Sequence, residues 1–432
     1  MHKTKLSRKF WLALVIFSLV GQVAWVVENM YLNVFIYKMF QADAKSISFM
    51  VAASAVSATV TTIFVGALSD KIGKRKLFIC AGYILWGVSI LCFGLIRTDV
   101  LKGLFPHAVS AASVGVTLVI ILDCVMTFFG SAANDACFNA WLTDSTDQTN
   151  RGSAEGINAM MPLLAILVVF GGFMGLNQDL PESWTVIFSV IGGGVLVMGI
   201  LGFFLIEEPP VNNAENTHYF KNLIYGFRPK VIREHPKYYL TLLAYAVFGI
   251  SINIFMPYLI LYYEKGLGMT DYVLVFAPAI LLAAVFTALY GRVYDRKGFR
   301  VAVLPAMGLL IAGYGVLYFT RQTATVFIGT VLMLCGYLSG MAVFGAMLRD
   351  HTPQNKAGMF QGQRIIGQVL LPGVIGPAIG AAVLQGAQVI RNSDGTESFL
   401  PNARIFAAAL AVALLVFVAL IPLVKKPVKV SE

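Results

Sequence analysis

The chain has 432 residues, of which 58% are hydrophobic and 12% are charged, and its mean hydropathy is +0.77. A soluble domain of this size carries about twice that charged fraction, so the composition excludes an ordinary soluble protein and indicates a membrane protein. The net charge of +10 does not indicate nucleic-acid binding, because Lys and Arg lie in short segments between apolar runs, where they orient a membrane protein.

Apolar runs that are long enough to cross a bilayer as helices recur along the whole chain. The first follows basic residues, as in a signal peptide, but it is too long and lacks a small-residue cleavage site, so we interpret it as helix 1. An even number of spans places both termini on one side, and the excess of Lys and Arg there predicts cytoplasmic termini in the cell (inner) membrane. The twelve predicted spans are 10–37, 46–69, 77–97, 114–142, 155–176, 184–206, 238–263, 271–293, 301–320, 324–348, 359–387 and 404–424.

The first span carries polar residues on one side. At 3.6 residues per turn they share one broad helix face. A carboxylate and amides beside an indole suit a sugar, because polar groups bind hydroxyls and the ring stacks on the pyranose face. The alternative is a hydrogen-bond network inside the helix bundle. The residues on this face are Gln22, Trp25, Glu28, Asn29 and Asn33.

A short basic turn, GALSDKIGKRK, separates the second and third spans, and a related turn, GRVYDRKGFR, occurs 225 residues later. The repeat predicts a duplicated membrane protein with one tight turn in each half. The glycine spacing differs from that of a phosphate-binding loop, so it does not support ATP hydrolysis. The first turn contains Gly66, Asp70, Gly73 and Arg75, and the second contains Gly291, Asp295 and Gly298.

The first turn resembles the signature between helices 2 and 3 of the major facilitator superfamily, Gly-x-Leu-x-Asp-[Arg/Lys]-x-Gly-[Arg/Lys]-[Arg/Lys], and fills every slot. The second turn departs from it at Val293 and Phe299. The resemblance implies an all-α fold of twelve transmembrane helices, with an N-terminal six-helix bundle at 1–206, a cytoplasmic linker at 207–237 and a C-terminal bundle at 238–432. It also implies that both turns form a conformational latch between the halves. The alternative role is a stable turn and topology signal.

The fourth span carries two acids, Asp123 and Asp135, beside the amide Asn134. Ionisable residues are costly inside a membrane and often face a cavity or a partner. Because helix 4 runs inward and helix 1 outward, we expect Asp123 and Glu28 to face one cavity at similar depth. Two carboxylates in low dielectric suit the binding of a coupling proton, with Asp135 as the next candidate. The alternative is a set of structural acids satisfied by hydrogen bonds.

A second repeat, with an offset of 206 residues, joins spans four to five and ten to eleven; it begins at Asp144 and at Asp350. Both joints resemble those of glycoside–pentoside–hexuronide:cation symporters, the group of the melibiose carrier. That group places aspartates in helix 2 for its cation. The second span here, 46–69, has no charged residue, so a sodium site copied from that group is not expected.

Candidate substrate contacts also lie in the second half. Asn253 and Tyr258 flank Pro257 in the seventh span, where a broken helix would form a gate. Arg364 and Gln368 share one face of the eleventh span. A buried arginine needs a counter-charge, such as Asp350 or Asp135, or a substrate oxygen. Structural pairing is the alternative to a role in substrate binding or gating.

The sequence therefore predicts a secondary active transporter that works by alternating access and is not an enzyme. The leading substrate is a sugar or glycoside taken up with a cation, either a proton or sodium. Alternatives are proton-coupled efflux of small amphipathic compounds and a membrane sensor without net transport. We expect a monomer in the lipid bilayer, with no cofactor, no metal and no nucleic-acid partner. The five cysteines fall inside spans and are interpreted as small apolar residues.

Overall fold

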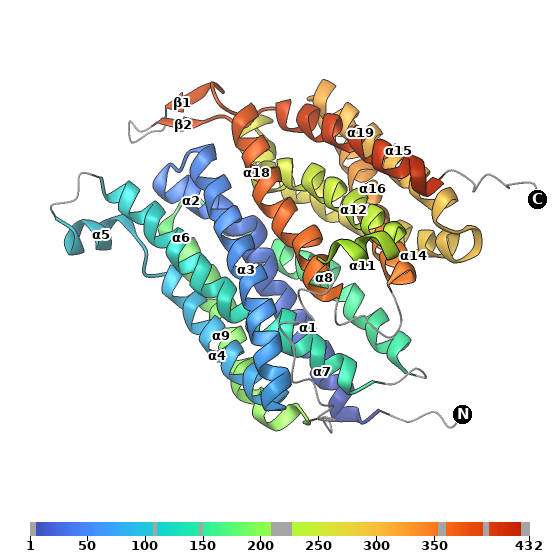
Figure 1. The fold of residues 1–432 in the computed structure, drawn as a ribbon. Coiled ribbons are helices and arrows are strands. Elements are labelled where there is room, and N and C mark those ends of the chain that lie inside the picture. The colour runs from blue at the N-terminus through green and yellow to red at the C-terminus, as the bar shows by residue number, and fades with distance from the viewer. Residues whose placement is uncertain are drawn as a thin grey trace, which may run out of the picture. The chain divides into compact units, whose positions relative to one another are not determined.

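The computed structural model describes residues 6–106, 110–146, 150–208, 227–352, 360–391 and 397–424. They form two compact units. Unit 1 comprises Met1–Tyr219 and Val389–Phe399, and unit 2 comprises Phe220–Gln388 and Leu400–Glu432. In Figure 1 the helices of unit 1 run from blue to green and those of unit 2 from yellow-green to red.

Unit 1 consists of long apolar helices and one short surface helix. Its first membrane helix is continuous from Arg8 to Phe40, and its fourth from Ala111 to Asp144. Its elements are α1 (Arg8–Val26), the π-helical segment η1 (Val27–Tyr31), α2 (Leu32–Phe40), α3 (Ala44–Ile72), α4 (Arg75–Phe93), α5 (Thr98–Leu104), α6 (Ala111–Gly130), the π-helical η2 (Ser131–Phe138), α7 (Asn139–Asp144), α8 (Arg151–Phe173) and α9 (Pro181–Leu205).

Unit 2 also consists of long apolar helices and one short helix. Its first and fifth membrane helices have the most interruptions. Its elements are α11 (Pro229–Glu234), α12 (Pro236–Phe255), the 3₁₀ turn η3 (Met256–Tyr258), α13 (Leu259–Leu261), the π-helical η4 (Tyr262–Gly266), α14 (Tyr272–Lys297), α15 (Phe299–Phe319), α16 (Thr323–His351), α17 (Gln361–Ile365), the π-helical η6 (Ile366–Leu370), α18 (Leu371–Val383) and α19 (Arg404–Val424).

The prediction of an all-α, twelve-span major facilitator layout is confirmed. The described residues include 11 helices that are long and apolar enough to cross a membrane, and the shorter apolar helix Ile157–Phe173 lies where the fifth span was predicted. Sequence periodicity did not predict α5, α11 or a β-hairpin. Part of the amphipathic helix expected at 220–227, and the turn expected at 392–395, lie outside the described residues.

The glycines of the basic turns end their helices in the left-handed region. Gly73 has φ 70° and follows α3, and Gly298 has φ 76° between α14 and α15. A side chain with a Cβ is strained there, which accounts for the last glycine of each turn motif. The start of α3 is fixed by Asp43, whose carboxylate accepts from the backbone N–H of Ser46 at 2.8 Å.

Four of the interrupted helices contain a π-helical turn. A π turn places an extra residue in the helix and re-aims the side chains that follow it. Glu28 lies in η1, Asn134 and Asp135 lie in η2, and Gln368 lies in η6. The helix faces expected from a regular 3.6-residue period are therefore shifted near these residues.

The hairpin consists of β1 (Val389–Arg391) and β2 (Glu397–Phe399), paired antiparallel with Val389 opposite Phe399. It belongs to unit 1, although the chain on both sides of it belongs to unit 2 (Figure 1). The Tyr37 hydroxyl of α2 donates to the Phe399 carbonyl oxygen at 2.7 Å, and their rings meet edge-on at 5.1 Å. These contacts fix the hairpin on the end of helix 1.

Candidate functional site

Glu28 is a buried acid in η1, with 7% of its surface exposed. Ser54 Oγ of α3 donates to Glu28 Oε1 at 2.6 Å, and Thr127 Oγ1 of α6 donates to the same oxygen at 2.8 Å. The two hydroxyl oxygens lie 2.9 Å apart. Glu28 Oε2 has no hydrogen-bond partner among the described residues. One carboxylate oxygen is thus held by two hydroxyls, while the other is available to a proton or a ligand.

Asp123 joins the same polar cluster. It lies one helical turn before Thr127 in α6 and is 2% exposed. Its Oδ1 also lacks a hydrogen-bond partner in the part of the chain that the structure describes. Thr127, which bonds Glu28, lies one turn from Asp123 in α6, and Asp123 is close enough to Glu28 for their charges to interact. We call Glu28, Ser54, Asp123 and Thr127 the acid cluster.

Ser54 is the member of the acid cluster that sequence reasoning missed. It lies in an uncharged span rich in Ala, Ser and Thr, where nothing distinguishes it from other small residues. The available signal was indirect: a buried carboxylate needs donors, and the nearby donors Trp25 Nε1 and Asn29 Nδ2 of helix 1 bond elsewhere. Hydroxyls on neighbouring helices were the remaining source in unit 1.

Trp25 and Asn134, two of the predicted substrate contacts, are hydrogen-bonded to each other. Trp25 Nε1 donates to Asn134 Oδ1 at 3.4 Å, and Asn134 Nδ2 donates to the Tyr83 hydroxyl at 2.8 Å. Tyr83 in turn donates to the Phe17 carbonyl at 2.7 Å. A Cβ at Gly21 would lie 2.4 Å from Asn134 Nδ2, so only glycine leaves room for this network. The network ties helices 1, 3 and 4 together.

Two amides of helix 1, Asn29 and Asn33, bond to their own helix. Asn29 Nδ2 donates to the Trp25 carbonyl, and Asn33 Nδ2 donates to the Asn29 carbonyl, each at 2.8 Å. Asn33 Oδ1 is buried and has no partner within the described ranges. Asn29 is exposed, whereas Asn33 is fully buried. These two residues therefore differ in environment despite their shared helix face.

Asp135 lies in η2, away from the hydrogen bonds of the acid cluster. Ser131 Oγ donates to Asp135 Oδ2 at 3.0 Å, and Asn139 Nδ2 donates to the Asp135 backbone carbonyl at 3.1 Å. Asp135 is partly exposed, unlike Asp123. The structure thus separates the three acids into a buried pair and one partly accessible carboxylate with a local donor.

In unit 2 the predicted arginine bonds to an amide. Arg364 Nε donates to Gln368 Oε1 at 3.1 Å, and Gln368 Nε2 is buried without a partner among the residues described. Asp350, one expected counter-charge, instead accepts from the Tyr294 hydroxyl. Arg364 therefore has no ion pair within the described part of unit 2. Its guanidinium is available to bind an oxygen of a ligand.

Asn253 and Tyr258 have neighbours inside unit 2. Asn253 Nδ2 donates to the Gly249 carbonyl at 3.0 Å. Tyr258 is fully buried at the 3₁₀ turn η3, and its hydroxyl donates to the Pro377 carbonyl of α18 at 3.4 Å. The helix is interrupted beside Pro257, as expected for a broken seventh span, and Tyr258 holds the break against α18.

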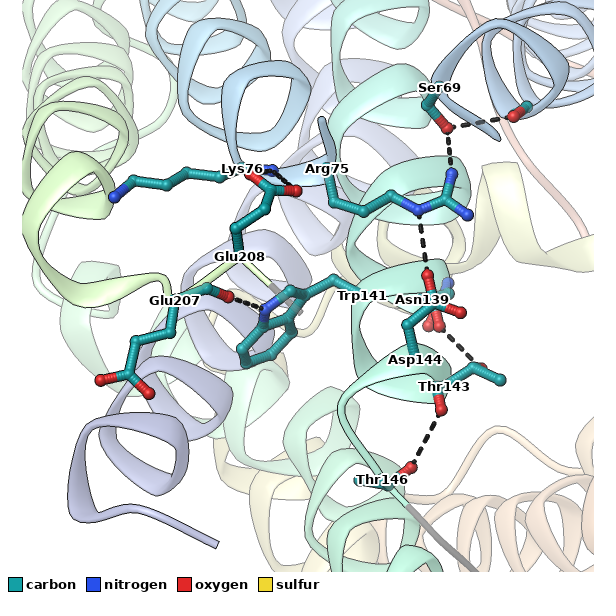
Figure 2. A network of polar contacts seen from close by, with 11 residues as sticks. Ser69, Arg75, Lys76, Asn139, Trp141, Thr143, Asp144, Thr146, Glu207 and Glu208 are labelled. Carbon is teal, nitrogen blue, oxygen red and sulfur yellow. Dashed lines mark hydrogen bonds and ion pairs between the residues drawn. The ribbon is translucent and has the colours of Figure 1, made fainter. Parts of the chain in front are cut away.

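The first basic turn is held by the Arg75 cluster, which we define as Ser69, Arg75 and Asp144. Arg75 is 6% exposed, and its Nε lies 3.1 Å from Asp144 Oδ2. Its Nη1 donates to Ser69 Oγ, which donates to the Gly66 carbonyl at 3.0 Å. Figure 2 shows the guanidinium reaching from the start of α4 to Ser69 on one side and Asp144 on the other. The cluster joins the ends of helices 2, 3 and 4.

The segment after helix 6 closes the same end of unit 1. The Glu208 carboxylate accepts from the backbone N–H of Lys76 at 3.2 Å, in the first turn of α4. Trp141 Nε1 donates to the Glu207 carbonyl at 2.9 Å (Figure 2). A carboxylate at a helix N-terminus is favoured by the helix dipole. The start of the predicted linker is thus fixed to helices 3 and 4.

The second basic turn is held differently. Tyr294 occupies the position of Ser69, 225 residues later, and its hydroxyl donates to Asp350 Oδ2. Asp350 corresponds to Asp144 in the second repeat. The side chains of Asp70 and Asp295, which the sequence assigned to a latch, lie outside the described part of the structure.

Comparison with known proteins decides the family. The model of the Major Facilitator Superfamily matches residues 10–377. The chain belongs to this superfamily. Its members are multi-pass membrane transporters of small molecules, so the chain has a transporter fold.

Solved structures share this major facilitator fold at low identity. A D-xylose-proton symporter is similar with a TM-score of 0.71 and 12% identity, covering 94% of this chain and 97% of that chain. The nucleoside transporter NupG has a TM-score of 0.67 and 11% identity, covering 96% of this chain and 99% of that chain. A relative named multidrug resistance protein 2, from Bacillus subtilis (strain 168), is 22% identical over 353 residues, which is 79% of this chain and 81% of the relative.

Proposed function

We propose that this major facilitator protein is a proton-coupled secondary transporter and that the acid cluster carries the proton. The observation that supports this most is the pair of buried oxygens, Glu28 Oε2 and Asp123 Oδ1, that lack partners within the described residues. An ionised carboxylate in that setting is costly, and a proton removes the charge. Ser54 and Thr127 hold Glu28 in place while it gains or loses the proton.

A sodium site of the melibiose-carrier type has less support. In that group helix 2 supplies carboxylates, whereas α3 here supplies the hydroxyl of Ser54. Two carboxylates with hydroxyls also suit a proton, because a proton needs only one free oxygen and no further ligands. Asp135 remains the second candidate for coupling, since it is partly exposed and has a single local hydroxyl donor.

For the substrate we propose a sugar or glycoside carried inward. Asn33 Oδ1 in unit 1 and Gln368 Nε2 in unit 2 are buried amide atoms without partners in the described ranges, and Arg364 has no ion pair there. Such groups bind hydroxyls well. Trp25, Glu28, Asn29, Asn134, Asn253 and Tyr258 complete the proposed substrate contacts. The joints that resemble the melibiose-carrier group favour the same class, as does the fold shared with a xylose–proton symporter.

Efflux of small amphipathic compounds by proton antiport is the second candidate. It is favoured by the relative named multidrug resistance protein 2, which aligns with 79% of this chain. Antiport would use the same acid cluster, with the proton entering as the substrate leaves. The direction of substrate movement under an imposed proton gradient separates the two functions.

The decisive experiment uses the purified full chain in vesicles. Uptake of a sugar panel and of amphipathic cations is measured with pH and sodium gradients imposed separately. In Glu28→Gln we expect substrate exchange across equal pools to persist while accumulation driven by the pH gradient falls by about tenfold or more. Asp123→Asn is the matched variant. Full accumulation in both would remove the acid cluster as the coupling site and leave Asp135.

We also propose the arrangement expected from the sequence: cytoplasmic termini in the cell membrane, a monomer, six-helix halves joined by 207–237, and turns that act as a latch. Cysteines at Lys45 and Lys74, in a background without the five native cysteines, test the orientation. Both positions are exposed and lie at opposite ends of α3. Labelling of the Lys45→Cys protein alone by an impermeant reagent from outside is expected, and the opposite pattern contradicts the orientation.

A further inference from the structure

Unit 1 contains a cavity of about 480 Å³ that belongs neither to the acid cluster nor to the basic turn. It lies beside α5, between the end of α2, the end of α4 and the first turn of α9. This is the end of helix 1 that is farther from the start of the chain. The size falls in the range of small-ligand sites, which is about 300–1,000 Å³.

The cavity has an apolar wall and a charged rim. Met39, Ile96 and Pro181 are the partly exposed apolar residues of the wall, and the rings of Phe35, Phe93 and Trp184 are buried. Arg97, Asp99 and Lys102 lie on the rim, which therefore carries charges of both signs. Aromatic residues with charged neighbours at the end of a membrane helix mark the depth of the lipid headgroups.

The rim charges are partly organised already. Arg97 Nε lies 3.2 Å from Asp99 Oδ1, and Arg97 Nη2 lies 3.2 Å from Glu182 Oε1. The guanidinium of Arg97 hydrogen-bonds Asp99 and holds the pKa of that carboxyl below its usual range, so it stays ionised at neutral pH. Lys102 makes no ion pair within the described ranges, and its ammonium is available to an anion.

We propose that this cavity binds a phospholipid whose headgroup carries a phosphate and a primary amine, as phosphatidylethanolamine does. Lys102 and Arg97 face the phosphate, and Asp99 accepts from the amine. The start of an acyl chain lies against Met39, Ile96 and Pro181. The bound lipid joins the ends of helices 1, 3 and 6, which adds a binding function away from the proposed transport site.

The charge pattern distinguishes this headgroup from others. A purely anionic headgroup has no positive group to pair with the carboxylates of Asp99 and Glu182, which would repel it. A choline headgroup carries a cation that cannot donate a hydrogen bond to Asp99. Free phosphoethanolamine has the required charges but no chain for the apolar wall, so it should bind more weakly.

The test is lipid retention by the purified full chain, measured by native mass spectrometry during titration with phosphatidylethanolamine. We expect Arg97→Gln to weaken retention about tenfold, because charge-assisted contacts to the phosphate are lost. Met39→Trp fills the cavity without touching a charge and should weaken retention to a similar degree. Arg321→Gln is the control, since Arg321 follows the equivalent helix α15 and bonds only to carbonyls.

Each comparison supports or overturns the proposal. Support requires stronger retention of phosphatidylethanolamine than of phosphatidylcholine or phosphatidylglycerol, and no displacement by soluble phosphoethanolamine at equal concentration. Equal retention in wild type and Met39→Trp would show that the cavity is not the site. Displacement by phosphoethanolamine would show that the occupant is a soluble phosphate ester, not a lipid. Thermal unfolding of each variant confirms that the protein remains folded.

Discussion

The two basic turns occupy equivalent places in the repeat but are held by different chemistry. In unit 1 the buried guanidinium of Arg75 pairs with Asp144 and bonds Ser69. In unit 2 the hydroxyl of Tyr294 donates to Asp350. The acids after helix 4 and helix 10 thus accept hydrogen bonds from different residue types, Arg75 in unit 1 and Tyr294 in unit 2. A motif match in sequence does not by itself predict the contact that the motif makes.

The interiors of the units differ in the same direction. Unit 1 encloses two acids beside hydroxyls on its first and fourth membrane helices, whereas unit 2 places an arginine and an amide on its fifth membrane helix. At these sites unit 1 carries carboxylates and unit 2 carries a guanidinium. If charge is the basis of this division, the variants that remove a charge should have larger effects than those that remove a neutral hydrogen bond.

The largest effect is expected from Arg75→Ala. The substitution removes a buried guanidinium and leaves the Asp144 carboxylate without its ion-pair partner. Asp144 is 32% exposed, so water compensates part of the loss. We expect a loss of about 2–3 kcal/mol, or about 2–3 °C in the thermal unfolding midpoint of the purified protein. Lys74→Ala, at the exposed neighbouring residue, is the control. Equal midpoints for the two variants would show that the Arg75 cluster does not stabilise the turn.

Ser54→Ala tests the acid cluster without removing an acid. Loss of one of the two donors to Glu28 Oε1 should lower stability by about 1–2 kcal/mol and reduce proton-driven accumulation. Ser57→Ala is the matched control, because Ser57 lies one turn along the same helix and donates to the Cys124 carbonyl at 2.9 Å. If Ser57→Ala alone impairs accumulation, Ser54 has no special role in holding Glu28.

Tyr294→Phe should have a smaller effect than Arg75→Ala. It removes one neutral donor from an exposed carboxylate, which is worth about 0.5–1 kcal/mol. The thermal midpoint should fall by about 0.5–1 °C. Tyr318→Phe, at an exposed tyrosine of the same unit, provides the baseline. A larger loss for Tyr294→Phe than for Arg75→Ala would reverse the comparison between the turns.

The smallest effect is expected at the rim of the cavity, where the side chain of Asp99 is 66% exposed. Its pKa is lowered by the hydrogen bond from Arg97. A carboxyl with a lowered pKa in the folded state stabilises above its unfolded pKa of about 3.9, and this contribution is lost as the pH falls through the folded pKa. Wild type and Asp99→Asn should therefore differ slightly at neutral pH and converge in strong acid. A difference that grows on acidification would contradict the ion pair.

Hydrophobic runs predicted the twelve spans because a helix that crosses a bilayer must be long and apolar. The glycine-bounded turns predicted that Gly73 and Gly298 lie at tight turns, and both have a positive φ. Residue type also predicted the buried acids Glu28 and Asp123. The π-helical turns escaped prediction because the 3.6-residue period assumes a regular helix, and they lie at Glu28, Asn134 and Gln368. Ser54 escaped because its role depends on which helices become neighbours, and the spacing along one helix contains no such information.

The hairpin at Val389–Phe399 has a consequence for the order of synthesis. Unit 1 needs this segment to complete the contacts of Tyr37, yet the ribosome makes it after nearly all of unit 2. The helices of unit 1 therefore enter the membrane before the hairpin exists. The surface around Tyr37 remains uncovered until residue 399 has been translated. A chain released early, before the hairpin, would keep the end of helix 1 uncovered and offer quality-control proteases a marker of incomplete translation.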